Sequence, residues 1–337
     1  MRRILLSLVV VAFLFSGTAF ADRLDDIVAR GNLVCGVNDQ LPGFGTINSQ
    51  GDFEGFDVDF CKAIAAAILG DANAVQYRAL SAQERFTAVQ TGEVDVLIRN
   101  TTWTSSRDTS VGLEFAPTTF YDGQGFMARK DSGITTLQDM EGRKICVQSG
   151  TTTELNLNDV LSALGISFEP VIYENADQLT AAYDQGACDT WTTDKSGLAS
   201  RLITLQNPDD HAILDATISK EPLGPAVLNG EQRLFDVVKW VVFGLWTAEE
   251  YGITSANVEE VAATTPVPDL RRMLGVEGNN VSDIGMRADG ILQAIKQVGN
   301  YAEIYDRNLG PSTPFDIPRG MNQQYTNGGV FYAPPFR

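Results

Sequence analysis

Short apolar runs alternate with amphipathic segments along the first third of the chain. Residues 33–37, 74–78 and 94–98 have the length and composition of buried strands. Between the first two runs, residues 56–69 place apolar side chains on one face of a predicted helix, and residues 81–84 form a capping box that opens another. Strands separated by helices at this spacing predict a doubly wound, mostly parallel sheet.

The same pattern restarts near residue 125. Three further strands are predicted, at residues 144–148, 168–173 and 187–192. The helices between them begin at the capping residues Thr151 and Asn175. This second unit closes near residue 220, and the chain then returns to the first unit through residues 223–227. Two crossings between the units predict a hinge.

The remaining segments complete a two-lobed organisation. Three later helices are predicted, at residues 229–251, 288–298 and 301–309. The predicted domains are lobe 1 at residues 22–125 and 224–310, with an insertion at about 252–287, lobe 2 at residues 126–223, and a C-terminal extension at residues 311–337. We expect this extension to lie on the surface, with an interaction tail as the alternative.

Residues 1–21 have the pattern of a cleavable signal peptide. Two arginines precede the apolar run 4–15, and an Ala-x-Ala site ends at Ala21. A transmembrane helix is the alternative, but the apolar run is shorter than the roughly 20 residues that span a bilayer. We therefore expect an exported, periplasmic product.

The charge balance excludes one class of partner. The formal net charge is −18, and loss of Arg2 and Arg3 with the signal peptide would leave −20. Such a chain repels phosphate backbones, so no nucleic-acid partner is expected.

The cysteine and histidine counts limit the possible chemistry. Four cysteines in an exported chain predict two disulfides. No C-x-x-C pair occurs and His211 is the only histidine, so neither a metal site nor a cofactor is expected. His211 follows a polar run and is expected on a surface loop, which argues against a Ser-His-Asp site.

A polar loop follows the predicted strand at residues 94–98. Thr104 and Ser105 are good N-caps, which places Arg107 in the first turn of the next helix. A cation there opposes the helix dipole, unless it holds a bound anion together with the free N–H groups. A guanidinium grips a carboxylate through two parallel hydrogen bonds, so a small carboxylate is the expected anion. The alternative is a surface ion pair with Asp108 or Glu114.

Five segments in order resemble the periplasmic polar amino-acid-binding proteins of ABC importers. They are residues 55–59, 95–98, 102–107, 148–152 and 299–305. The likeness covers about residues 33–309 apart from the insertion, and it is strongest to the broad-specificity branch of solute-binding protein family 3. The resemblance implies an α/β type II periplasmic binding protein, in which each lobe is a doubly wound, mostly parallel sheet flanked by helices.

The resemblance also implies a set of ligand contacts. Arg107 matches the arginine that holds the ligand α-carboxylate, helped by Thr102 and the backbone at Thr152. Asp194 matches the carboxylate that receives the α-ammonium, and the carbonyl of Asn100 matches a second acceptor. The alternatives are that Asp194 is only a helix N-cap and Thr102 a plain loop hydroxyl.

The resemblance is weaker for the residues that would contact the ligand side chain. Gln148 stands where narrower relatives often have a lysine or another side-chain reader, with a strand-end residue facing water as the alternative. Asn38 and Thr193 line the same cleft. Trp103 is expected to pack in the core rather than stack on the ligand.

The resemblance implies a non-enzymatic binding protein. It would close around L-amino acids such as glutamate, glutamine, aspartate and asparagine and deliver them, as a monomer, to an inner-membrane permease. The alternative is an exported lyase or dehydratase on the same fold, with Glu84 or Asp39 as acid or base. The expected disulfides are Cys35–Cys61 and Cys146–Cys188, because each pairs a strand with a segment of the same unit.

Overall fold

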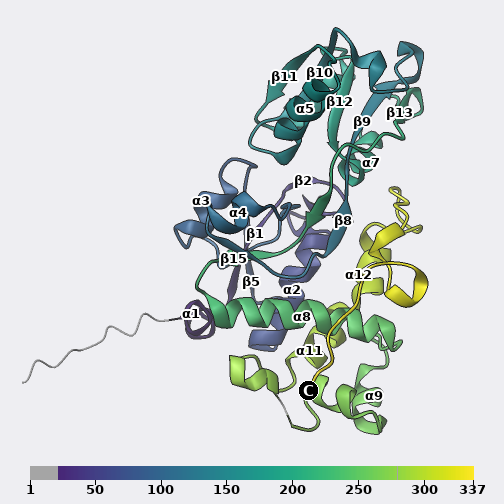
Figure 1. Ribbon diagram of the computed structural model, residues 1–337. Helices are drawn as coiled ribbons and strands as arrows, with labels where there is room; N and C mark the ends of the chain where they lie inside the picture. The colour runs from purple at the N-terminus through teal and green to yellow at the C-terminus, as the bar shows by residue number, and fades with distance from the viewer. Residues whose placement is uncertain (1–21, 279) are drawn as a thin grey trace, which may run out of the picture.

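A computed structural model describes residues 22–278 and 280–337 of the chain. The signal peptide expected at residues 1–21 lies outside the described residues. The described chain forms two lobes, each built around its own five-stranded sheet (Figure 1).

The sheet of lobe 1 has the strand order β5-β1-β6-β15-β7. Its strands are β1 (Leu33–Val37), β5 (Val75–Ala79), β6 (Val96–Leu97), β7 (Leu113–Phe115) and β15 (Ala226–Leu228). β1 pairs in parallel with β5 and β6, whereas β15 runs antiparallel to both of its neighbours. All five residues of β1 are buried, as expected for a central strand with both faces covered.

The sheet of lobe 2 has the order β11-β10-β12-β9-β13. Its strands are β9 (Gln124–Arg129), β10 (Arg143–Gln148), β11 (Phe168–Tyr173), β12 (Thr190–Asp194) and β13 (His211–Ile213). β10 is parallel to β11 and β12, and β9 is antiparallel to β12 and β13. Both sheets are therefore mostly parallel, as predicted, and each contains one reversed strand.

Two strands connect the lobes. β8 (Phe120–Asp122) and β14 (Glu221–Leu223) pair in antiparallel register, with Glu221 opposite Asp122. The chain thus enters lobe 2 through β8 and leaves it through β14, and the two crossings lie side by side (Figure 1).

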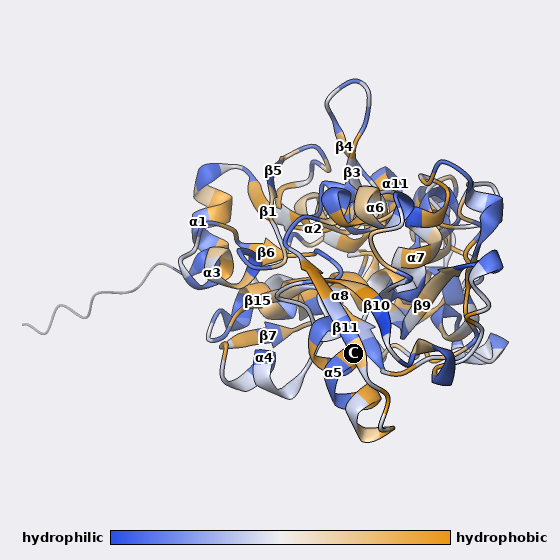
Figure 2. Cartoon of the chain, turned by 90° about the horizontal axis from the view of Figure 1, so that it is seen from above, coloured by the Kyte–Doolittle hydropathy of each residue, from blue (hydrophilic) through white to orange (hydrophobic). Residues whose placement is uncertain are grey.

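Helices flank both sheets. Those of lobe 1 are α1 (Arg23–Arg30), α2 (Phe56–Leu69), α3 (Arg85–Gln90), α4 (Ser105–Thr109), α8 (Gln232–Glu250), α11 (Gly290–Val298) and α12 (Tyr301–Asn308). Those of lobe 2 are α5 (Thr152–Ala163), α6 (Ala176–Asp184) and α7 (Lys195–Leu202). The small sheet of β2 (Gln40–Leu41), β3 (Gly45–Ile47) and β4 (Phe53–Glu54) ends in a polar hairpin that projects from the molecule (Figure 2).

The insertion and the C-terminal extension pack on lobe 1. The insertion contains α9 (Val258–Thr264) and α10 (Pro268–Met273). In the extension, Phe331 is fully buried and stacks on Trp246 with ring centroids 4.3 Å apart. The extension is therefore anchored in the core of lobe 1. It does not lie only on the surface, as its composition predicts.

The structure contains both expected disulfides. Cys35 bonds to Cys61, which joins β1 to α2, and Cys146 bonds to Cys188, which joins β10 to the segment before β12. Each lobe therefore has one internal covalent link.

Two placements differ from the predictions. His211 is buried in β13, where its Nδ1 lies 2.8 Å from the hydroxyl of Tyr183, so the surface-loop prediction is wrong. The polar residues before it form a short turn, Pro208–Asp210, in which none of the three residues is buried, so the burial begins at His211 itself. Trp103 stacks on Phe115 but is 42% exposed, so it is only partly packed.

Candidate functional site

A pocket lies between the lobes, at the carboxyl ends of the parallel strands. It is lined from lobe 1 by Asn38, Leu41, Arg85, Arg99, Asn100 and Thr102, and from lobe 2 by Gln148, Thr151, Thr152, Thr153, Ala176, Leu179, Trp191, Thr193, Asp194, Ser196, Gly197 and Arg201. Strand ends at a change of strand order are where open α/β sheets bind ligands.

The lining includes seven of the eight residues expected from the sequence: Asn38, Asn100, Thr102, Gln148, Thr152, Thr193 and Asp194. The eighth, Arg107, is not part of the lining. The structure therefore brings residues from four separate segments to one pocket and places Arg107 beside it.

Arg107 lies directly behind the pocket wall. Thr104 caps α4 by accepting a hydrogen bond from the Arg107 N–H, as predicted. The guanidinium is buried, packs on the ring of Phe86 and donates from Nη1 to the carbonyl of Thr102 at 2.8 Å. Burial lowers its pKa, and the charges of Glu221 and Asp194 oppose that shift. The alternative, a surface ion pair of Arg107 with Asp108 or Glu114, is absent from the described residues.

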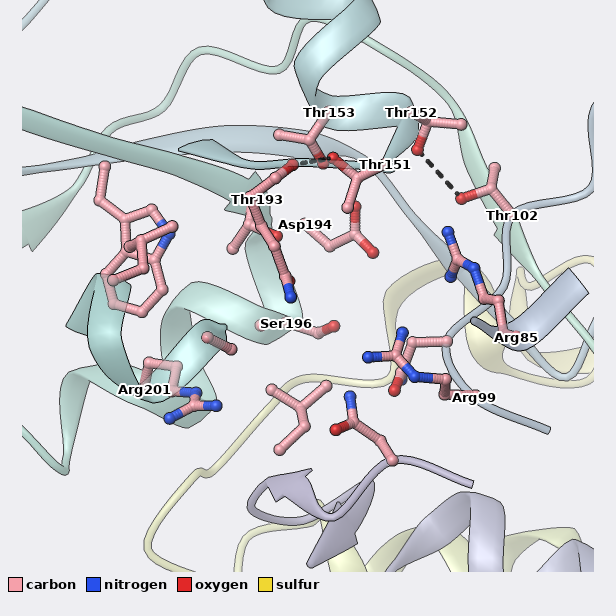
Figure 3. A pocket seen from close by; sticks show the side chains of 18 residues that line it. Arg85, Arg99, Thr102, Thr151, Thr152, Thr153, Thr193, Asp194, Ser196 and Arg201 are labelled. Carbon is pink, nitrogen blue, oxygen red and sulfur yellow. Dashed lines mark hydrogen bonds between the residues drawn. The ribbon is translucent and has the colours of Figure 1, made fainter. Parts of the chain in front are cut away.

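Two further arginines, which the sequence analysis did not select, reach the pocket from lobe 1. Arg85 and Arg99 are buried, and their guanidinium groups extend into the space opposite Asp194 (Figure 3). Arg85 Nε has no hydrogen-bond partner, and burial next to Arg107 and Arg99 lowers the pKa of Arg85 well below its usual value. Burial likewise lowers the pKa of Arg99 to about 10.

These cations feel nearby carboxylates but have no direct ion-pair partner in the described part of the chain. Within the described residues, no carboxylate forms an ion pair with Arg85, Arg99 or Arg107, whereas Arg201 on the other wall pairs with Asp177 at 2.7 Å. Buried charges are normally paired, because leaving water is costly. The unpaired guanidinium groups therefore make the pocket a receptor for an anionic group.

Asn100 turns the chain at the floor of the pocket. Its φ of +45° lies in the left-handed region, where asparagine is tolerated better than most residues. The Asn100 N–H donates to the carboxylate of Asp57 at 3.0 Å, and its own buried Oδ1 has no partner. Strained backbone of this kind is often found where a loop meets a ligand.

Asp194 supplies a carboxylate on the opposite wall. It precedes α7, but its side chain makes no capping hydrogen bond, so the structure does not support a plain helix cap. Burial between the lobes, followed by the charges of Asp122 and Glu221, raises its pKa well above the usual value, although the carboxylate still faces the pocket. A cation bound here would relieve this repulsion.

Glu221 is a central residue that the sequence analysis did not select. It is buried on β14, and its carboxylate accepts hydrogen bonds from side chains of both lobes. The sequence signal is weak, because Glu221 follows a lysine in a short connecting segment and resembles a solvent-exposed residue.

The lobes also touch each other around the pocket. Gln83 donates to Ser149 at 2.9 Å, Arg85 donates to the carbonyl of Gly150 at 3.2 Å, and Arg201 donates to the carbonyl of Gln40. These contacts join the lobes at two places, residues 83–85 with 149–150 and Arg201 with Gln40, as expected for a closed cleft.

Some polar groups at the pocket already have partners within the protein. Gln148 Nε2 donates to the carbonyl of Glu174 at 3.0 Å, so this side chain is held at the rim. Thr151 caps α5, and the residues Thr151, Thr152 and Thr153 at the start of that helix line the pocket. A helix N-terminus is a common binding site for anions. Within the described residues, no group of three or more His, Cys, Asp or Glu side chains could hold a metal ion.

Comparisons with known proteins agree with this architecture. Residues 33–311 match the family model of the bacterial extracellular solute-binding proteins, family 3. The chain is 50% identical to the general L-amino acid-binding periplasmic protein AapJ of Rhizobium johnstonii, over 96% of this chain and 95% of the relative. It is 49% identical to the glutamate/glutamine/aspartate/asparagine-binding protein BztA of Rhodobacter capsulatus, over 98% and 97% of the two chains.

A solved structure extends the likeness to the whole fold. The chain resembles an ABC transporter periplasmic binding protein from Brucella ovis with glutathione bound, with a TM-score of 0.91 and 50% identity. The match covers 94% of this chain and all of the other. The predicted fold class, a two-lobed periplasmic binding protein, is confirmed.

Proposed function

The chain belongs to family 3 of the bacterial extracellular solute-binding proteins, and from this premise we propose that it binds L-amino acids between its lobes and delivers them to an ABC permease of the inner membrane. Relatives that match nearly the whole chain are named as amino-acid-binding proteins of the periplasm, which supports this function over the lyase.

The observation that carries the proposal is the charge pattern of the pocket. Arg85, Arg99 and Arg107 are buried without ion-pair partners in the described chain, and Asp194 lies across the pocket from them. An amino-acid zwitterion presents the complementary charges, since its carboxylate suits the guanidinium side and its ammonium the Asp194 side.

We assign the shared ends of the ligand to the residues that the family resemblance indicates. Arg107, Thr102 and the helix N-terminus at Thr152 hold the α-carboxylate, and Asp194 and the Asn100 carbonyl hold the α-ammonium. Support comes from the position of four of these residues in the pocket lining and of the Arg107 guanidinium directly behind Thr102.

We assign the ligand side chain to the remaining polar groups of the lining. They are the guanidinium groups of Arg85, Arg99 and Arg201, the amides of Asn38 and Gln148 and the hydroxyl of Thr193. We therefore propose glutamate, aspartate, glutamine and asparagine as ligands, which are the amino acids in the printed name of BztA.

Glutathione is a second candidate ligand. It is bound in the Brucella ovis relative, which is 50% identical to this chain. Its glutamyl residue carries a free α-carboxylate and a free α-ammonium, so the same residues can hold that end.

Binding and release require the lobes to move. We propose that residues 22–125 and 224–310 form one rigid unit and residues 126–223 the other, with β8 and β14 as the hinge. The mature protein would begin at Asp22 and act as a monomer in the periplasm.

Two measurements test this proposal. Equilibrium dialysis of ligand-free protein against L-glutamate should give one site per chain, and absence of binding would contradict the function. Mass spectrometry after prolonged incubation should recover the amino acid unchanged. Product in excess of the protein would favour the lyase instead.

A further inference from the structure

The carboxylate of Glu221 is surrounded by hydrogen-bond donors. Its Oε2 accepts from the hydroxyls of Thr102 at 2.5 Å and Thr152 at 2.9 Å, and its Oε1 accepts from Asn156 at 2.9 Å and Ser219 at 2.6 Å. Glu221 is 1% exposed and is not part of the pocket lining, whereas its partners Thr102 and Thr152 are.

These bonds fix where two hydroxyl hydrogens point. A threonine hydroxyl has a single hydrogen, and an ionised carboxylate can only accept. Thr102 and Thr152 therefore both donate their hydroxyl hydrogens to Glu221, and the Oγ1 atoms of the two threonines lie 3.3 Å apart. Thr102 lines the pocket, and with its hydrogen donated to Glu221 its hydroxyl oxygen has only lone pairs left for a ligand.

We propose that Glu221 is a positioning residue that makes the Thr102 hydroxyl an acceptor for the ligand α-ammonium. This inference rests on the proposed amino-acid function and refines the role of Thr102, whose hydroxyl serves the ammonium while its backbone remains available to the carboxylate. Together with Asp194 and the Asn100 carbonyl, the Thr102 oxygen would give the three ammonium hydrogens three acceptors.

The competing role for Glu221 is a strut, meaning a purely structural link that holds the two lobes together through its hydrogen bonds. Its partners do come from both lobes, since Thr102 follows β6 and both Thr152 and Asn156 lie on α5. A strut would act through all of its contacts, whereas the proposed role acts mainly through Thr102. The two roles therefore differ in how mutations combine.

The substitution Glu221→Gln tests the role. Glutamine keeps the shape but has one uncharged acceptor oxygen for the four donors that now share two carboxylate oxygens, so the hydrogen of the Thr102 hydroxyl is held less firmly. The affinity for L-glutamate, measured by calorimetry, should fall by roughly 10- to 100-fold. The melting temperature of the ligand-free variant reports whether the fold is intact.

A double-mutant cycle with Thr102→Val decides between the roles. In the Thr102→Val background, Glu221→Gln should cost less than about threefold in affinity, because the oriented hydroxyl is already gone. In the matched Thr152→Val background, the full cost should remain. If Glu221→Gln costs as much with Thr102→Val as without it, Glu221 is a strut and the inference is wrong.

A further variant covers the case in which Glu221→Gln does not fold. Thr102→Val alone should then weaken L-glutamate by about tenfold or more, and an unchanged affinity would overturn the inference. A wild-type protein that does not bind L-glutamate would contradict the proposed function itself, which is a different outcome.

Discussion

The carboxylate of Asp57 accepts a hydrogen bond from the backbone N–H of Asn100 at 3.0 Å. Asp57 stands in the first turn of α2, and Asn100 is the left-handed residue of the loop that follows β6. Two of the sequence motifs, residues 55–59 and the polar loop, are thus one structural unit. The buried carboxylate holds the strained loop in the shape that lines the pocket.

This contact predicts a pH dependence of stability. Burial raises the pKa of Asp57 to about 7, against 3.8 in an unfolded chain. Between these two values the unfolded state releases a proton that the folded state keeps, so the contribution of Asp57 to the free energy of unfolding falls by about 1.4 kcal/mol per pH unit as pH rises. Above about pH 7 the loss is complete.

The variant Asp57→Asn should remove this dependence, because asparagine keeps an acceptor for the Asn100 N–H and does not ionise. Urea unfolding at pH 4.5 and 7.5 should show the variant gaining stability relative to the wild type at the higher pH. The control Asp52→Asn, in the exposed β3–β4 hairpin, should follow the wild type. An equal difference at both pH values would contradict the role of Asp57.

Arg107→Lys should weaken every amino-acid ligand by a similar factor. Lysine keeps the charge but cannot form the two-pronged contact with a carboxylate, so the loss falls on the end that all ligands share. The expected cost is about 2 kcal/mol, or roughly thirtyfold in affinity. The matched control is Arg78→Lys, at a half-exposed ion pair with Glu93, which should bind as the wild type does.

Arg85→Gln should instead change the order of ligand preference. The Arg85 guanidinium lines the pocket opposite Asp194 and has an unpartnered Nε, so it suits a ligand side-chain carboxylate. Affinities for glutamate and aspartate should fall roughly tenfold more than those for glutamine and asparagine. Competition titrations with the four ligands measure this, and a uniform loss would place Arg85 at the shared end.

Removal of the disulfides should lower stability without abolishing binding. The bonds Cys35–Cys61 and Cys146–Cys188 close loops with sequence separations of 26 and 42 residues. The chain-entropy estimate for such loops is about 3.5 and 4 kcal/mol. Urea unfolding of the two double-serine variants should show losses of this order, and a larger loss for Cys35–Cys61 would show that loop length is not the main factor.

Local patterns predicted most of the fold. Strand β1, helix α2 and the caps Thr104 and Thr151 depend on short-range periodicity and side-chain chemistry, and the structure places them as expected. The reversed direction of strands β9 and β15 is not predicted by these patterns, because it follows from how the chain re-enters each sheet.

The residues that the sequence analysis missed depend on tertiary contacts. Arg85 resembles an ordinary helix residue until burial against Arg99 and Arg107 removes it from water. His211 follows exposed aspartates, and only the packing of Tyr183 shows that it is buried. Seven of the pocket residues were found because the motifs of the family, rather than the periodicity of the chain, mark them.

Calorimetry with ligand-free protein and each of the twenty L-amino acids tests the central claim most directly. The account predicts one site per chain, with binding of glutamate, glutamine, aspartate and asparagine, because the contacts to the α-carboxylate and α-ammonium are common to all four. Absence of binding by all twenty amino acids, or nanomolar binding of one with none of its neighbours, would contradict it.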